Sequence, residues 1–260
     1  GQNIKREWDT RVEQMLSHRL PGSGVFPPRL HTSADGVMLH IGGRWQEVKT
    51  ASVFETNGAG EAIRIGYFAS HCPSNVFGRY WRVLAHQAGM DHCCDVIVVA
   101  DGAHWIWMEV GKYFPRSKQI IDLCHVMGYV WAVANLRFGT GSAEASAWCH
   151  NQSDLLKKNE ADKVLANVRD WKPRKADCRE AREDLISYFT EHKHRMAYAS
   201  YLKENYQIGS GVEEACNKNV VQARMKQAGM RWGETRSESI LQLCTWYHSH
   251  DRQQINRYLA

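Results

Sequence analysis

Three acidic residues stand where metal-dependent chemistry can be supported: Asp35, Asp101 and Glu214. Asp35 and Asp101 each precede a glycine and adjoin a predicted strand, and Glu214 opens a predicted helix after the loop 209–211. Carboxylates are the oxygen ligands that Mg²⁺ prefers, and two such ions about 3.5–4 Å apart promote phosphoryl transfer by activating the attacking oxygen and stabilising the leaving one. The pattern predicts two Mg²⁺ ions, replaceable by Mn²⁺, held by Asp35, Asp101 and Glu214 as metal ligands and catalytic residues.

Each acid also has an ordinary structural explanation. Asp-Gly pairs form turns, and a glutamate in a first helical turn stabilises the helix dipole. Asp101, however, ends the most apolar run of the chain, residues 95–100, and α/β sheets bind ligands beyond the carboxyl ends of their strands. The positions of the acids relative to predicted strands therefore favour a functional site over unrelated turns.

A basic, amide-rich stretch follows Glu214. Residues 215–232 contain no Asp or Glu, and the cations there are Lys218, Arg224, Lys226 and Arg231. Such a surface beside a metal site is typical of contacts with a phosphate backbone, so we expect these four residues to bind DNA. A solvated helix face is the alternative explanation.

The elements that must position these residues begin with a run of strands. Residues 35–41 alternate between apolar and other side chains, so Asp35 is expected at the start of a strand. Two further strands are predicted at 45–54 and 62–70, after turns at Gly42-Gly43 and Asn57-Gly58. Short turns between consecutive strands predict an antiparallel meander.

After the third predicted strand, helical and strand patterns alternate, and the chain then becomes helical. We predict a helix at 76–89, a strand buried on both faces at 95–100, a fifth strand at 118–122, and helices throughout 126–205. Two last helices are expected at 212–228 and 235–258. This order, taken with the three carboxylates, predicts an α/β fold of the RNase H-like type: a mixed five-stranded sheet with flanking helices and an all-helical insertion between the second aspartate and the glutamate.

The predicted organisation has four parts. Residues 1–29 form a lead-in helix and linker, 30–125 the first part of the catalytic core, 126–206 the helical insertion, and 207–260 the helices that complete the core. The chain starts at Gly1, so a preceding segment of a longer protein is one explanation for its short lead-in.

Composition sets outer limits on function. The 260 residues carry a formal net charge of +5 with a pI of about 8.7, which permits a nucleic-acid partner without requiring one. No apolar run approaches the roughly 20 residues that span a bilayer, so we expect no membrane partner. The eight cysteines include no C-x-x-C pair, which favours reduced thiols and a cytoplasmic location. A DNA-binding function in a bacterium would add association with the nucleoid. The thirteen histidines show no repeated ligand spacing.

Four segments resemble a known family in the same order along the chain. Residues 206–232, YQIGSGVEEACNKNVVQARMKQAGMRW, resemble the C-terminal signature of ISKra-type insertion-sequence transposases. Residues 99–107, VADGAHWIW, are similar to the block around that family's second aspartate, and Asp35-Gly36 with WQEVK at 45–49 to the block around its first. Residues 122–125, DLCH, resemble the D-x-x-H motif of several RNase H-like transposases.

The resemblance implies a DDE transposase that cleaves double-stranded DNA at element ends and joins it to target DNA, active as a homo-oligomer. Asp35, Asp101 and Glu214 then form the triad. The family has two small or apolar residues before the glutamate, whereas this chain has Val212-Glu213, so Glu213 stays open as the alternative to the favoured Glu214.

The same resemblance suggests accessory roles near the active site for Asp122 and His125. The alternative is an Asp122 helix cap beside a packed His125. Trp105 is a candidate for stacking on unpaired DNA bases, with Trp107, although a buried strand position is expected for at least one of them.

Two other functions remain open. One is a nuclease or resolvase on the same core that performs no strand transfer. The other is a non-catalytic DNA-binding fragment of a transposase, since no helix-turn-helix for end recognition is recognisable in the sequence.

Overall fold

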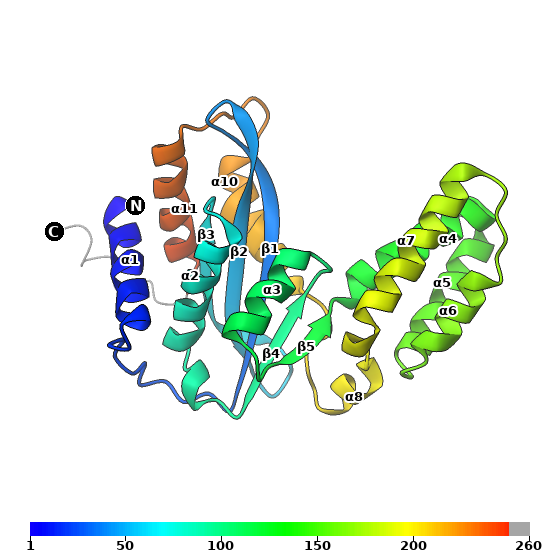
Figure 1. Ribbon diagram of the computed structural model, residues 1–260, viewed down its shortest axis with the longest axis horizontal. Helices are drawn as coiled ribbons and strands as arrows, with labels where there is room; N and C mark the ends of the chain where they lie inside the picture. The colour runs from blue at the N-terminus through cyan, green and yellow to red at the C-terminus, as the bar shows by residue number, and fades with distance from the viewer. Residues whose placement is uncertain (250–260) are drawn as a thin grey trace. The chain divides into compact units, whose positions relative to one another are not determined.

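The computed structural model describes residues 1–249, which divide into two compact units (Figure 1). Unit 1 comprises Gly1–Val98, Ala103–Lys118 and the chain from Gly211 onward. Unit 2 comprises Val99–Gly102 and Gln119–Ser210. Asp35 and both glutamates therefore belong to unit 1, whereas Asp101 belongs to unit 2.

A five-stranded sheet has the order β3-β2-β1-β4-β5. Its strands are β1 (Arg29–Ile41), β2 (Arg44–Thr56), β3 (Ala62–Ser70), β4 (Asp95–Ala100) and β5 (Lys118–Ile121). β1 pairs antiparallel with β2, β2 antiparallel with β3, and β1 parallel with β4. The predicted meander and the α/β class with a mixed five-stranded sheet are confirmed.

The β1–β2 hairpin is closed by two glycines. Gly42 and Gly43 have φ values of +58° and +81°, and Ile41 pairs with Arg44 across them. A two-residue turn with positive φ at both positions matches the right-handed twist of the flanking strands, and glycine adopts this conformation without steric cost. The turn fixes the register that sets Asp35 opposite Thr50.

β1 is longer than predicted, which corrects the expected position of Asp35. The strand starts at Arg29, so Asp35 lies in its middle rather than at its start. The missed residues include His31, Thr32 and Ser33, which are buried but polar and therefore hide the apolar alternation of a strand. Thr32 satisfies its hydroxyl inside the sheet by donating to the Ser52 carbonyl oxygen at 2.7 Å.

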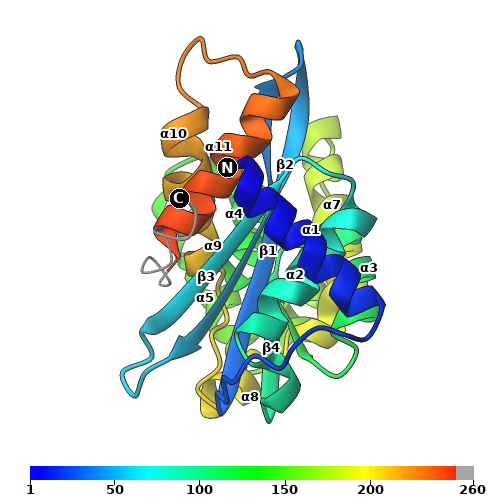
Figure 2. The same cartoon turned by 90° about the vertical axis from the view of Figure 1, so that its left-hand side faces the viewer.

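Helices cover both faces of the sheet in unit 1 (Figures 1 and 2). One face is covered by α2 (Ser74–Gln87) and α3 (His104–Tyr113), and α1 (Gln2–Leu16) packs on α2 and α11. The buried Trp81 of α2 donates its indole N–H to the Thr32 hydroxyl at 2.7 Å, which ties that helix to β1.

The opposite face is covered by the C-terminal helices. They are α9 (Gly211–Ala215), the π-helix η3 (Cys216–Gln222), α10 (Ala223–Met225) and α11 (Glu234–His248). Their apolar side chains pack with Val37, Leu39 and Ile41 of β1, so the odd positions of β1 share the predicted buried face. The first of these helices was expected as one α-helix over 212–228, but it is π-helical in the middle and ends at Met225.

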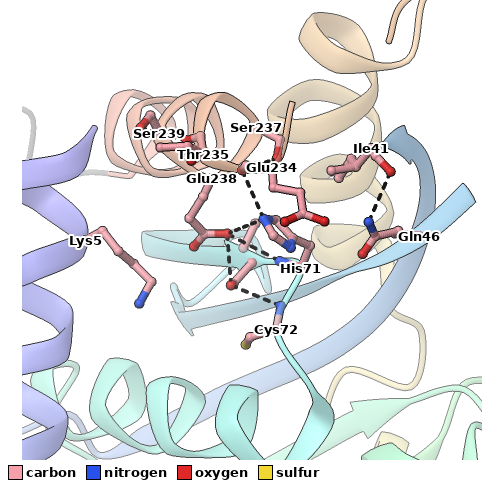
Figure 3. A network of polar contacts seen from close by, with 12 residues as sticks. Lys5, Ile41, Gln46, His71, Cys72, Glu234, Thr235, Ser237, Glu238 and Ser239 are labelled. Carbon is pink, nitrogen blue, oxygen red and sulfur yellow. Dashed lines mark hydrogen bonds and ion pairs between the residues drawn. The ribbon is translucent and has the colours of Figure 1, made fainter. Parts of the chain in front are cut away.

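A polar network anchors α11 to the end of β3 (Figure 3). Glu238 accepts a hydrogen bond from the Ser70 hydroxyl at 3.1 Å and lies 3.5 Å from the His71 Nε2. The Gln242 amide donates to the Ala69 carbonyl oxygen at 2.9 Å. None of the predicted site residues takes part in these contacts, so the network explains the placement of α11 and not the candidate chemistry.

Unit 2 is built mainly of helices. They are α4 (Leu123–Phe138), α5 (Ala143–Leu156), α6 (Ala161–Arg169), α7 (Ala176–His192) and α8 (Tyr198–Lys203). Ser142 caps α5 by accepting a hydrogen bond from the Ala145 amide at 3.0 Å. Within residues 1–249, no helix has the length and apolar character that crossing a membrane requires.

Two other sequence predictions concern the tryptophans at 105 and 107 and the end of the last helix. The tryptophans at 105 and 107 lie on helix α3, not on a strand, because a three-residue W-I-W alternation is too short to distinguish the two structures. The last helix was predicted to reach residue 258. α11 ends at His248, and residues 250–258 of that prediction lie outside the described residues.

Candidate functional site

Asp35 is held in a defined orientation by residues of unit 1. Its Oδ2 accepts a hydrogen bond from the Asn217 amide nitrogen, and its Oδ1 accepts one from the Gly36 backbone N–H at 2.6 Å. The Thr50 hydroxyl lies 2.8 Å from the Asn217 Oδ1 and fixes that amide in turn. Neutral donors from its own strand and from η3 therefore orient the Asp35 carboxylate, and Thr50 of β2 supports the Asn217 amide.

Glu213 lies beside Asp35 and is buried, with 1% of its surface exposed. Neither carboxyl oxygen has a hydrogen-bond partner of normal geometry within residues 1–249. Burial raises the pKa of Glu213 to about 7, the hydroxyls of Ser52 and Thr50 offset part of that rise, and the charge of Asp35 adds to it. Two acids thus share a poorly solvated space, an arrangement typical of functional sites and costly without a ligand.

The helical stripe explains why Glu213 faces the sheet. Residues 213, 216, 217, 220 and 221 are all buried, at the spacing of one helix face. Cys216, Val220 and Val221 supply the apolar part of this stripe, which continues through Met225. Residues three and four positions before these apolar residues include Glu213 and Asn217. This spacing is a signal that the sequence prediction did not use.

The structure places Glu213, not Glu214, beside Asp35. Glu214 is exposed, one residue further around the helix and off the buried stripe. The preference for Glu214 depended on the spacing from the glycine loop, which does not reveal the direction of a side chain. Asn217, Thr50 and Ser52 also contribute to this site although the sequence analysis did not assign them to it.

Asp101 follows β4 directly and belongs to unit 2, so it lies in a separate part from Asp35. The next residue, Gly102, packs so closely that a Cβ there would lie 2.4 Å from the Tyr188 ring and 2.9 Å from the His192 Nε2. The charge of Asp101 contributes to raising the pKa of Tyr188, mainly a result of burial. Helix α7 therefore provides the immediate surroundings of Asp101 within its unit.

Asp122 has a structural role that the sequence left open. Its fully buried carboxylate caps α4 by accepting hydrogen bonds from the Cys124 and His125 amides at 2.5 and 3.1 Å. The other oxygen accepts hydrogen bonds from the Ser210 amide at 2.6 Å and from the Ser210 hydroxyl. Asp122 thus joins the start of α4 to the loop that precedes α9, and the cap is confirmed. His125 is exposed, so its predicted packing is wrong.

We expect Asp122→Asn to lower the free energy of unfolding by about 3 kcal/mol, because an amide presents N–H groups to donors and leaves buried groups unpaired. The measurement is urea unfolding followed by the helical circular dichroism signal. His125→Ala is the matched control from the same motif and should stay within about 0.5 kcal/mol of wild type. Equal unfolding midpoints for wild type and Asp122→Asn would contradict the stabilising role of the Asp122 hydrogen bonds.

The four cations predicted to contact DNA are all exposed: Lys218, Arg224, Lys226 and Arg231. Arg231 precedes Trp232, whose backbone N–H donates to the His40 carbonyl oxygen at 3.0 Å and pins this loop to β1. Their role in DNA binding stays a prediction.

Trp105 is half-buried and already has protein contacts. Its ring lies edge-on to Phe77, with centroids 5.7 Å apart, and the Lys49 ammonium is 5.3 Å from its centroid. These contacts account for the position of Trp105 without DNA.

Within residues 1–249, no group of three His, Cys, Asp or Glu side chains is arranged to hold a metal ion. The two carboxyl groups of the predicted site that lie near each other are those of Asp35 and Glu213. The chain matches no known family model, and no curated protein shows significant similarity to it.

Proposed function

We propose that this chain is the catalytic part of a DDE-type DNA transposase with an RNase H-like core, in which residues 126–206 form a helical insertion. The observation that carries the proposal is the pairing of Asp35, from the middle of β1, with the buried Glu213 of α9. The family resemblance of residues 206–232 supports it. The proposed triad is Asp35, Asp101 and Glu213, with Glu213 in place of Glu214.

Asp101 supplies the third carboxylate in this proposal. It directly follows β4, the strand that pairs in parallel with β1. The proposal requires the Asp101 carboxylate to reach the other two acids when Mg²⁺ binds.

The residues of the site bind and orient rather than transfer protons. Bound Mg²⁺ ions supply Lewis-acid stabilisation of the attacking and leaving oxygens in such sites. Asn217 holds the Asp35 carboxylate and Thr50 holds the Asn217 amide. Burial of Glu213 favours loss of its proton only when a cation is present. The exposed cations after Glu213 hold the DNA backbone.

Strand cleavage and joining on DNA that carries the sequences flanking the coding region test this function. Wild-type protein with Mg²⁺ or Mn²⁺ should nick the end and join the freed 3′ hydroxyl to a second duplex. Asp35→Asn and Asp101→Asn should each reduce cleavage at least about a thousandfold, since a lost metal ligand removes several kcal/mol of transition-state stabilisation. Arg64→Gln, which alters an exposed ion pair with Glu55, is the control and should cleave normally.

Three other results would overturn the proposal or part of it. Full cleavage by Asp101→Asn would exclude the assigned triad. Cleavage without joining would replace the transposase by a nuclease or resolvase on the same site. Metal-independent DNA binding without any product would leave only a DNA-binding fragment.

A further inference from the structure

The β1–β2 hairpin of unit 1 reaches beyond the other strands of the sheet. In the described part of the chain, β4 pairs with only the first four residues of β1, and β3 pairs with β2 only from Lys49 onward. Residues 36–48 therefore form a two-stranded ribbon that ends at the glycine turn. Such a projecting ribbon is free to contact a partner.

One face of this ribbon is exposed and carries an indole ring. Trp45 lies directly opposite His40, so their side chains share a face, with ring centroids 5.7 Å apart. Trp45 is 61% exposed, and Met38 is 44% exposed on the same face. We call Met38, His40 and Trp45 the aromatic face. The opposite, packed face belongs to Leu39 and, further along the strand, to Asp35, so the aromatic face is separate from the candidate acids.

The loop between α10 and α11 runs beside the ribbon (Figures 1 and 2). Trp232 of this loop pairs with Ile41 as in a parallel sheet, through backbone hydrogen bonds of 2.8 and 3.0 Å to the residues on either side of Ile41. Strand alternation therefore turns Arg231 toward the face that carries Trp45. A guanidinium and an exposed indole thus lie on the same side of the hairpin.

The charge at this end of unit 1 is positive. Three exposed cations form no ion pair within residues 1–249: Arg44, Lys226 and Arg231. Two acids lie nearby. Glu47 is bound to Lys49 at 2.7 Å, and Glu234 approaches the turn at Gly42. The cations outnumber the acids that remain, and this balance is complementary to phosphate groups.

We propose that the aromatic face binds a single-stranded segment of DNA, with an unpaired base stacked on Trp45 and the phosphates held by Arg231 and by Arg44 at the tip. Proteins bind single strands by combining aromatic rings that stack on bases with cations that follow the backbone. In a duplex both faces of a base are covered by its neighbours, so an exposed indole selects unpaired bases.

A protein partner fits this surface less well. A stable protein interface buries about 800 Å² on each side around an apolar core, whereas the aromatic face offers only two well-exposed apolar side chains, Trp45 and Met38. The inference rests on the proposed function, whose DNA partner it specifies.

The test is binding of dye-labelled DNA to the full chain in EDTA, measured by fluorescence anisotropy. The probes are a thymidine oligonucleotide of about 20 nucleotides and a blunt duplex of the same length. Trp45→Ala should weaken binding of the single strand about tenfold and binding of the duplex by less than about twofold. Trp45→Phe keeps a ring that can stack and should retain most of the affinity. Arg231→Gln should weaken both complexes and reduce their salt dependence.

Trp131→Ala is the matched control, because Trp131 is also an exposed tryptophan but lies on α4 of unit 2. It should bind both probes within about twofold of wild type. Trp45→Ala should keep the melting temperature of wild type, because most of the ring is exposed and removing it leaves no buried cavity.

The outcomes separate this inference from the proposed function. Because binding is measured without metal, single-strand binding that depends on Trp45 in a protein that cleaves no DNA would support the aromatic face and remove the transposase. Cleavage and joining by a protein whose Trp45→Ala variant binds the single strand as tightly as wild type would do the reverse. Equal weakening of both probes would contradict base stacking. A change in the sedimentation of the DNA-free chain, with DNA binding unaltered, would make the face a contact between two copies and overturn the inference.

Discussion

Glu213→Gln is expected to abolish metal-dependent DNA cleavage, reducing its rate at least about a thousandfold, whereas Glu214→Gln cleaves within about threefold of wild type. The physical reason is the direction of the two side chains. Glu213 is buried beside Asp35, and Glu214 is exposed off the buried stripe. Loss of a carboxylate ligand removes several kcal/mol of transition-state stabilisation, which corresponds to a factor of this size.

The measurement is the single-turnover rate of strand cleavage with Mg²⁺ and again with Mn²⁺. Glu214→Gln is a closely matched control, because it makes the same chemical change one residue away on the same short helix. The opposite order of effects, with Glu214→Gln inactive and Glu213→Gln active, would contradict the assignment of Glu213 to the triad. Glu214, the glutamate that the sequence favoured, would then be the triad residue.

The same substitution is expected to stabilise the metal-free protein above neutral pH. The pKa of Glu213 is about 7 in the folded chain, against 4.5 for an ordinary glutamate. Each unit of pKa difference corresponds to about 1.4 kcal/mol, so ionising this buried group costs the folded state about 3 kcal/mol at pH 8. Glu213→Gln avoids that cost because glutamine stays neutral.

The direction of the pH dependence follows from proton uptake. Below pH 4.5 the glutamate is protonated in both the folded and unfolded chain, and its contribution to stability is fully present. Between pH 4.5 and about 7 only the folded chain keeps the proton, so the free energy of unfolding falls as the pH rises. Above about pH 7 the proton is lost from both states, and the fall is complete.

Urea unfolding of wild type and Glu213→Gln in EDTA, from pH 4 to pH 9, measures this difference. The two proteins should have nearly equal free energies of unfolding at pH 4 and differ by about 3 kcal/mol at pH 8, with the variant more stable. Mg²⁺ should restore part of the wild-type stability and none of the variant's. Parallel stability curves across the range would show that Glu213 is not buried as described.

Much of the sheet was predictable because its signals are local. The glycine pair at 42–43 and the alternating residues 37–41 specify a hairpin with one buried face, and both features are present in the structure. The start of β1 was not predictable in the same way. His31, Thr32 and Ser33 are polar, and only their partners across the sheet and in α2 make burial possible there.

For the candidate site, the sequence by itself determined which acids stand next to which elements, because Asp-Gly dipeptides and a glycine loop before a helix are local patterns. It selected Asp35 and Asp101 without any knowledge of their surroundings. The tertiary structure alone shows which of Glu213 and Glu214 lies near Asp35. Two adjacent helical residues point about 100° apart, and only the packing of the apolar stripe on the sheet determines which carboxylate is buried beside Asp35. The same packing gave Asn217 its place on Asp35, because a hydrogen bond between residues 182 positions apart depends on the folded chain.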